Sequence, residues 1–237
     1  MRVESDTARL DDGHEQFHAV HGGPPPASSA ESSIHFPVAR VIKRAVDLVA
    51  AVVLLVFGTP LCCLVGLAIW LEDGRPVLFR QTRVGRHGAL FTLYKLRSMR
   101  NDAEGDGVPQ WAAPDDARVT RIGRWIRALR IDEIPQAWNV LVGDMAFVGP
   151  RPERPEFVKV LRVAIPGYEQ RHRVRPGMTG WAQVNQPYSG SIDDARRKLD
   201  LDLHYLRTWS PALDMFILLR TARIILFGWG GRSSFLQ

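Results

Sequence analysis

The longest apolar segment of the chain is its most informative hydrophobic pattern. Residues 48–71 run for 24 positions without a charged side chain, which is typical of a helix that enters a lipid bilayer. As a straight α-helix this segment would be about 36 Å long, enough to cross the hydrocarbon layer. The pattern therefore predicts a membrane helix, with a helical hairpin buried in a soluble core as a weaker alternative.

Two features of this segment argue against a simple crossing. Thr59 and Pro60 fall at its midpoint, and a proline inside a helix removes one backbone hydrogen bond and clashes with the preceding turn. Lysine and arginine also flank the segment on both sides, although positive charge accumulates on the cytoplasmic side of a membrane. A helix that breaks at Thr59 and Pro60 and returns to the same face fits both features. The Thr59 hydroxyl or protein packing would then cover the freed backbone groups. From the residues alone, a re-entrant and a spanning helix stay equally open.

A β-hairpin is predicted directly after the membrane segment. Residues 77–83 and 90–96 have the composition of strands, and the glycine-containing stretch 85–88 between them reads as the turn. Lys95 on the second strand stands in a neighbourhood rich in arginine. It is either a phosphate contact or an exposed strand residue, and the local pattern favours the second interpretation.

Helical periodicity dominates the remaining chain. Between residues 118 and 130, apolar positions recur at helical spacing and arginines recur at every third position. Such a helix can lie in the headgroup layer of a membrane, although a solvated basic face is the common alternative. Residues 193–209 and 214–229 predict two further helices, and residues 181–185 predict a short strand.

These elements predict an α+β fold that is mostly helical, with a small β-hairpin and interfacial amphipathic helices. The predicted units are a disordered tail at 1–37, a membrane helix at 38–74 that is either re-entrant or spanning, a folded domain at 75–230 and a C-terminal tail at 231–237. The first tail is expected to be disordered because its polar composition offers too little apolar area to offset the entropy of ordering.

Charge and composition narrow the function classes. The net charge is +6 at pH 7, with far more arginine than lysine, which suits nucleic acid, anionic lipid or a phosphorylated substrate. No nucleic-acid motif, Walker motif or zinc spacing is found, so nucleic acid is not an expected partner. Cys62 and Cys63 are neighbours inside the apolar segment and do not indicate a disulfide framework.

The densest candidate chemistry lies in residues 129–152. Asp132 and Glu133 stand at the predicted start of a short helix, where the positive end of the helix dipole keeps a carboxylate ionised. An ionised aspartate suits a nucleophile or a metal ligand. Arg151 sits in a rigid Gly-Pro-Arg-Pro turn, and its planar fork matches phosphate oxygens. On this stretch alone, a plain helix cap at Asp132 and a surface charge at Arg151 are equally consistent.

Several motifs, in order, resemble the bacterial sugar transferase family, the monotopic polyprenyl-phosphate phosphoglycosyltransferases. The resemblance covers residues 38 to 227. Besides the interrupted apolar segment, the motifs are KRAVD at 43–47, FTLYKLRSM at 91–99, RIDEIPQ at 130–136, NVLVGDM at 139–145, VGPRP at 148–152 and RPGMTGW at 175–181.

The resemblance implies a reaction and a place for it. A nucleotide-activated sugar, usually a UDP-sugar, would give its sugar phosphate to undecaprenyl phosphate, which initiates the synthesis of an exopolysaccharide or another glycoconjugate. The expected location is the bacterial inner membrane, with the domain at 75–230 catalytic and on the cytoplasmic face. With Thr59 and Pro60 matching the family's break, the resemblance favours the re-entrant helix. A homodimer is one option for the oligomeric state.

The resemblance also implies roles for individual residues. Asp132 would be the nucleophile, forming an aspartyl-phosphosugar intermediate, and Glu133 would help to hold Mg²⁺, the expected cofactor, so that both carboxylates are candidate metal ligands. Further positions match the family's active site or lie in its motifs, and these are the candidate substrate-binding residues: Lys95, Arg127, Arg151, Arg175 and Asp202.

Departures from the family pattern leave the sugar open. Residues 186–190 read QPYSG where Gly-Arg-Asn is familiar, which is more similar to members attached to exopolysaccharide export. The rival hypothesis is a non-catalytic scaffold or lipid-binding protein of such a system, anchored in the membrane.

Overall fold

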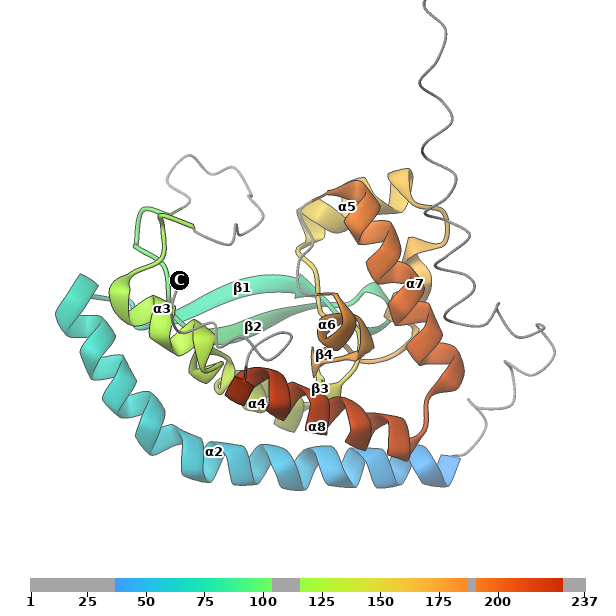
Figure 1. Ribbon diagram of the computed structural model, residues 1–237, viewed down its shortest axis with the longest axis horizontal. Coiled ribbons are helices and arrows are strands. Elements are labelled where there is room, and N and C mark those ends of the chain that lie inside the picture. Colours follow the sequence, from blue (N-terminus) through green and yellow to red (C-terminus); the bar gives the residue numbers. More distant parts are fainter. Residues whose placement is uncertain (1–36, 104–115, 187–190, 228–237) are drawn as a thin grey trace, which may run out of the picture.

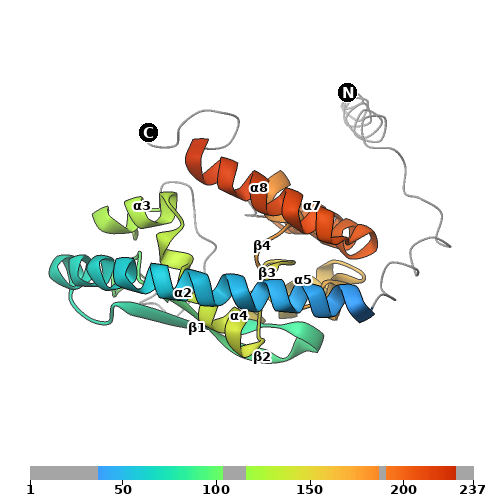
Figure 2. The same ribbon diagram turned by 90° about the horizontal axis from the view of Figure 1, so that it is seen from below.

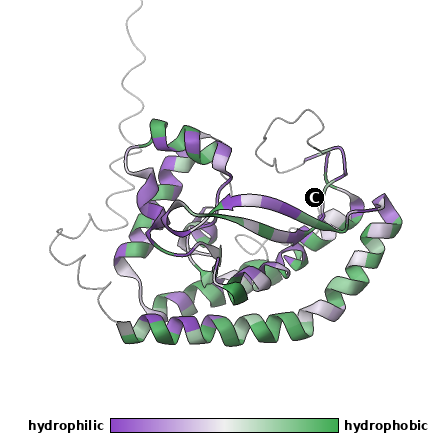
Figure 3. Ribbon diagram, turned by 180° about the vertical axis from the view of Figure 1, so that it is seen from behind, coloured by the Kyte–Doolittle hydropathy of each residue, from purple (hydrophilic) through white to green (hydrophobic). Residues whose placement is uncertain are grey.

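The computed structural model describes residues 37–103, 116–186 and 191–227. Helix α2 (Pro37–Asp73) forms one edge of the molecule, and the other elements lie on its concave side (Figure 1). The predicted C-terminal tail and all but the last residue of the predicted N-terminal tail lie outside the described residues. By length and composition, α2 is the one described helix that could cross a membrane, and 11% of its most apolar window is buried in the protein. Its central part is almost continuously hydrophobic (Figure 3).

Helix α2 bends but does not break. Pro60 lies inside a single helix of 37 residues, so the predicted interruption at Thr59 and Pro60 is not found. The helix instead follows a curved course (Figure 1). Helices bend in this way where a proline removes one backbone hydrogen bond. The Thr59 hydroxyl donates to the Leu55 carbonyl, a contact that also tends to bend helices.

Both ends of α2 are bonded to the same folded domain. Near its start, Lys43 Nζ donates to Asp214 Oδ2 at 2.6 Å, and Asp47 Oδ1 accepts from the Phe147 amide at 3.2 Å. At its end, the Glu72 carboxylate accepts from the first two amides of helix α3, at 2.9 and 3.1 Å. Arg97 is buried there and donates to the Asp73 carbonyl at 2.9 Å.

The predicted hairpin is confirmed. Strands β1 (Leu78–Val84) and β2 (Leu90–Leu96) pair antiparallel, with Phe79 opposite Lys95. The turn between them contains the short η3 helix (Arg86–Gly88). The outer edge of β2 is covered by helix α4 (Gln136–Val142), whose Asn139 side chain donates to Thr92 O and accepts from the Tyr94 amide.

A second, parallel pair of strands joins the middle of the chain to its later part. Strand β3 (Ala146–Val148) pairs with β4 (Gly177–Thr179). The segment after β3 closely approaches the segment before β4: a Cβ on Gly149 would lie 2.6 Å from the Arg175 carbonyl oxygen. The sequence pattern did not predict this pair, because three-residue strands are too short to show a period.

Helices make up most of the remaining described residues. Their bounds are α3 (Arg121–Ala128), η4 (Ile131–Glu133), α5 (Pro155–Ala164), η5 (Tyr168–Arg173), α6 (Trp181–Asn185), α7 (Ile192–Thr208) and α8 (Pro211–Phe227). The predicted strand at 181–185 is wrong: it is one helical turn, stabilised by a bond from Asn185 Nδ2 to Trp181 O. Helix α7 begins where the Ser191 hydroxyl caps the Asp194 amide.

Two of the apolar clusters in the core meet at Phe147 of β3. One joins Ala51 of α2 to Leu93 of β2 and to Ala137 and Val140 of α4. The other joins Val148 to α6, α7 and α8. Figure 2 shows α2 between the hairpin with α4 and the layer that contains α7 and α8. The α+β class with mostly helical elements is therefore confirmed.

Candidate functional site

Asp132 and Glu133 lie in a buried turn between two helices. Helix α3 begins at the Thr120 cap and ends at Ala128, and Arg130 then takes a left-handed backbone conformation with φ of 56°. A non-glycine residue in this region carries backbone strain, and such strain collects at functional sites. The turn directs both carboxylates inward, and each side chain is almost completely buried.

Glu133 is held by an arginine from a distant turn. Arg151 donates from Nη2 to Glu133 Oε1 at 2.7 Å and from Nη1 to Glu133 Oε2 at 3.4 Å. Arg130 donates to Oε1 as well, at 3.2 Å. Burial alone would raise the pKa of Glu133, but the charges of Arg151 and Arg130 outweigh it and lower the pKa to about 2. Glu133 is therefore a permanent anion that orients Arg151.

Asp132 has the opposite environment. Burial, followed by the charge of Glu133, raises its pKa to about 6, while the charges of Lys95, Arg130 and Arg127 oppose this rise. Its Oδ1 atom is buried and has no hydrogen-bond partner among the described residues. A buried, unpartnered carboxylate oxygen surrounded by cations is an unusual arrangement for a purely structural residue.

Lys95 and Arg127 complete the positive surroundings of Asp132. Lys95 projects from β2, with its ammonium group 5.0 Å from the centre of the Phe79 ring. Burial, followed by repulsion from Arg83, lowers the pKa of Lys95 to about 8. Arg127 lies in the last turn of α3. Neither side chain forms an ion pair within the described part of the chain, so both cations are available to an anionic ligand.

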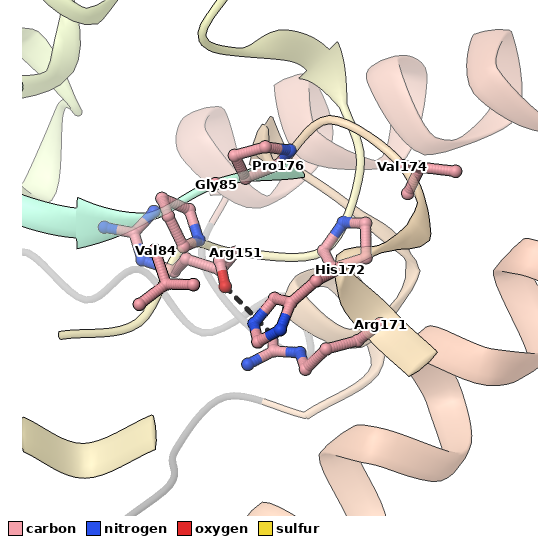
Figure 4. Close-up of a pocket in the computed structure, with 9 residues that line it drawn as sticks. Val84, Gly85, Arg151, Arg171, His172, Val174 and Pro176 are labelled. Atoms are coloured by element: carbon pink, nitrogen blue, oxygen red, sulfur yellow. Dashed lines mark hydrogen bonds between the residues drawn. The ribbon is translucent and has the colours of Figure 1, made fainter. Parts of the chain in front are cut away.

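The Arg151 turn is supported by a buried ionic cluster. Arg171 donates from Nη2 to the Arg151 carbonyl at 2.9 Å, as the dashed line in Figure 4 shows, and from Nη1 to the Tyr168 hydroxyl at 2.7 Å. The same Nη2 is 2.7 Å from Asp202 Oδ2, and both side chains are 2% exposed. A cavity of about 10 Å³ separates this cluster from Val84 and Gly85 of the hairpin (Figure 4), roughly enough for one water.

The structure thus brings four of the predicted site residues around Asp132: Glu133, Lys95, Arg127 and Arg151. Two others lie elsewhere. Asp202 faces Arg171 in the cluster behind the Arg151 turn. Arg175 donates from Nε to the Gly143 carbonyl at 2.8 Å, at the end of α4.

Comparison with known proteins shows the family of the chain. The model of the family described as bacterial sugar transferase matches residues 38–228. The chain belongs to this family. It is 46% identical over 196 residues to the UDP-N-acetylgalactosamine-undecaprenyl-phosphate N-acetylgalactosaminephosphotransferase of Aeromonas hydrophila, an alignment that covers 83% of this chain and 46% of that protein.

Other relatives are matched over more of their own length. The chain is 45% identical over 186 residues to the UDP-glucose:undecaprenyl-phosphate glucose-1-phosphate transferase of Caulobacter vibrioides, covering 78% of this chain and 69% of that protein. It is 41% identical over 194 residues to the uncharacterized sugar transferase EpsL of Bacillus subtilis, covering 80% and 90%. The chain thus spans less than half the length of the Aeromonas relative but most of EpsL.

The two carboxylates fit a magnesium ion in part. No group of three or more His, Cys, Asp or Glu side chains that could hold a metal occurs in the described ranges. Mg²⁺, however, commonly uses one or two carboxylates and takes its other ligands from water and substrate phosphates. Asp132 Oδ1 is available for this purpose, whereas Glu133 is engaged by Arg151 and Arg130.

Sequence reasoning missed Arg171 and Glu153 in the cluster that supports the Arg151 turn. Arg171 stands in the polar stretch YEQRHR, and Glu153 follows the Arg151 turn. Glu153 accepts from Lys198 at 2.5 Å, and burial opposed by the charges of Lys198 and Arg171 leaves its pKa at about 2. Charged residues in polar stretches look like surface residues, and no local signal showed that these would be buried.

Proposed function

We propose that this protein transfers a sugar 1-phosphate from a UDP-sugar to undecaprenyl phosphate through a covalent intermediate on Asp132. The observation that carries the proposal is the buried, unpartnered Oδ1 of Asp132 within reach of the electrostatic influence of Lys95, Arg127 and Arg130. Two anions in water repel each other, but the positive charges around a buried carboxylate offset this repulsion. The carboxylate can then approach a diphosphate. The names of the Aeromonas and Caulobacter relatives support the two substrates.

The first displacement forms a bond between Asp132 and phosphorus. A carboxylate oxygen of Asp132 attacks the phosphorus that bears the sugar, and the bond from this phosphorus to the bridging oxygen of the diphosphate breaks. UMP leaves with the electron pair of that bond. Lys95 and Arg127 lie where charge builds up on the phosphoryl oxygens, and Arg151, oriented by Glu133, supplies a third cation.

The second displacement restores the enzyme. A phosphate oxygen of undecaprenyl phosphate attacks the same phosphorus, the bond to Asp132 breaks, and the carboxylate is released. The product is undecaprenyl diphosphate sugar, and the two steps together neither consume nor release a proton. When bound, Mg²⁺ would neutralise phosphate charge and would be held by Asp132, joined by Glu133 only where Arg151 releases it.

The anchoring of α2 supports a re-entrant placement. Lys43 and Asp47 near its start and Glu72 at its end are all bonded to one domain. A helix whose two ends are attached to the same compact domain cannot place those ends on opposite sides of a bilayer. We therefore place α2 in the cytoplasmic leaflet of the bacterial inner membrane, with the catalytic domain on the cytoplasmic face. The exposed apolar residues of α2 and α8 would contact lipid.

UMP release tests this proposal. Detergent-solubilised protein would be incubated with Mg²⁺, undecaprenyl phosphate and a panel of UDP-hexoses and UDP-N-acetylhexosamines. We expect UMP from at least one donor and a phosphosugar adduct on the intact protein when the lipid is omitted. Asp132→Asn should abolish both signals, while Asp200→Asn, which changes an exposed aspartate of α7, should leave both at the wild-type level.

The opposite result has a clear meaning. If folded wild-type protein releases no UMP and forms no adduct with any donor, the catalytic proposal fails, and the scaffold or lipid-binding function takes its place. If UMP forms at an unchanged rate in Asp132→Asn, the reaction proceeds without the proposed nucleophile.

A further inference from the structure

Gln136 is a buried polar residue that the proposed chemistry has not yet used. It begins helix α4, one turn after Asp132, and is 1% exposed. Its Nε2 atom is buried and has no hydrogen-bond partner among the described residues. Buried amide groups in folded proteins are nearly always bonded, because an unbonded donor forfeits the hydrogen bonds that it made with water. The unpartnered donor therefore needs an explanation.

Asn139 on the same helix shows what a structural amide looks like here. It is completely buried, and its Nδ2 donates to Thr92 O at 2.7 Å while its Oδ1 accepts from the Tyr94 amide at 3.2 Å. These bonds attach α4 to the outer edge of β2. Gln136 lies one turn earlier and makes no comparable bond to the described part of the protein, so its amide does not serve to attach the helix.

The spacing of residues places Gln136 between this attachment and the nucleophile. Ile134 and Pro135, which link the 3₁₀ turn of Asp132 to α4, both have a right-handed helical conformation. Asp132, Gln136 and Asn139 therefore follow one another at intervals of about one helical turn. The first and last of these three residues both interact with β2: Asn139 bonds to its backbone, and the charge of Lys95 acts on Asp132. Two buried atoms without a hydrogen-bond partner among the described residues, the acceptor Asp132 Oδ1 and the donor Gln136 Nε2, thus belong to residues about one turn apart in the chain.

We propose that the Gln136 carboxamide binds a non-bridging oxygen of the phosphoryl group that Asp132 attacks. This inference rests on the proposed function and assigns a further substrate-binding residue to the same site. A neutral donor suits this position because it stabilises the phosphoryl oxygens and leaves the nucleophilicity of Asp132 unchanged. A cation paired directly with the carboxylate would reduce that nucleophilicity. The hydrogen bond missing in the protein alone would be made by the substrate.

The test compares two isosteric substitutions on one helix. Gln136→Met keeps length and volume but removes the donor, and Asn139→Leu does the same at the satisfied amide. We expect Gln136→Met to keep the wild-type Tm or exceed it, while kcat/KM for the donor falls roughly 10- to 100-fold. Asn139→Leu should lower the Tm because it leaves the Thr92 carbonyl and the Tyr94 amide without their partner. Gln136→Glu, which replaces the donor by an anion facing phosphate, should be less active than Gln136→Met.

Readouts with and without turnover separate this inference from the proposed function. The rate of UMP release is measured together with the rise in Tm that a saturating UDP-sugar produces. Suppose that the wild type shows UMP release and stabilisation by the donor, and that Gln136→Met has a kcat/KM within twofold of the wild-type value. The role of Gln136 is then overturned, while the proposed function stands. A Gln136→Met variant that loses as much Tm as Asn139→Leu also overturns that role, since the residue would then be structural. A wild type with neither UMP release nor stabilisation by any donor overturns both proposals.

Discussion

Gly58 of helix α2 packs directly against Ile134, two residues after Asp132. A Cβ on Gly58 would lie 2.6 Å from Cγ2 of Ile134, far inside van der Waals contact. Glycine therefore allows the bent helix to approach the turn that carries the two carboxylates. The apolar segment and the proposed active site are in contact at this point, so the position of α2 bears directly on the geometry of Asp132.

Substitution at this contact should impair both stability and activity. Gly58→Ala improves intrinsic helix propensity, but the clash with the β-branched Ile134 should dominate and cost roughly 1 to 3 kcal/mol of unfolding free energy. The double variant Gly58→Ala, Ile134→Ala removes the clashing atom and should lose less than the sum of the single variants. Thermal unfolding and UMP release measure the two effects. Additive losses, with no coupling between the positions, would contradict the contact.

The raised pKa of Asp132 makes a prediction about stability. Its pKa is about 6 in the folded protein against an ordinary 3.8, so the folded state holds this proton more tightly than the unfolded chain does. The contribution of Asp132 to stability therefore decreases as pH rises through this window. In EDTA at pH 7, Asp132→Asn should be more stable than wild type by roughly 1 to 3 kcal/mol, and near pH 4 this advantage should nearly vanish. A gain of the same size at both pH values would argue against the shift.

The lowered pKa of Lys95 predicts how activity depends on pH. Because burial and neighbouring arginines lower this pKa to about 8, kcat/KM should decline as pH rises above that value and the ammonium loses its charge. Lys95→Arg keeps the charge at every accessible pH. Its activity should be lower, but its decline should move to higher pH. If the alkaline decline stays in place in this variant, another group is responsible for it.

Asp202 is predicted to act through Arg171 rather than on the substrate. Asp202→Asn leaves a fully buried arginine without its nearest counter-ion, and breaking a buried pair from one side costs about 3–5 kcal/mol. We expect a marked fall in Tm together with a fall in kcat as the Arg151 carbonyl loses its fixed partner. A raised donor KM with an unchanged Tm would instead point to direct contact between Asp202 and substrate.

The anchoring of both ends of α2 predicts the topology. Tags placed before residue 1 and after residue 237 should both be cytoplasmic, and neither should be cleaved by protease added to intact cells whose outer membrane has been permeabilised. A protease-accessible N-terminal tag would show that α2 spans the membrane and would contradict the same-side anchoring.

The sequence determined the features that depend on local pattern. The apolar segment, the hairpin at 78–96 and the helices after residue 191 follow from charge-free length and from periods of two and 3.6, which are properties of neighbouring residues. The adjacency of Asp132 and Glu133 and the rigid Arg151 turn were visible in the same way, and the family motifs gave these residues their predicted roles.

Only the tertiary structure decided which charges are buried and with what partners. Glu133 meets Arg151 across 18 residues, Arg171 meets Asp202 across 31, and no local period reports such pairs. The bend of α2 also depends on tertiary contacts. A proline permits either a bend or a break in a helix, and the contacts at both ends of α2 and at Gly58 favour the bend. The difference between the satisfied Asn139 and the unpartnered Gln136 likewise depends on what β2 places beside each amide.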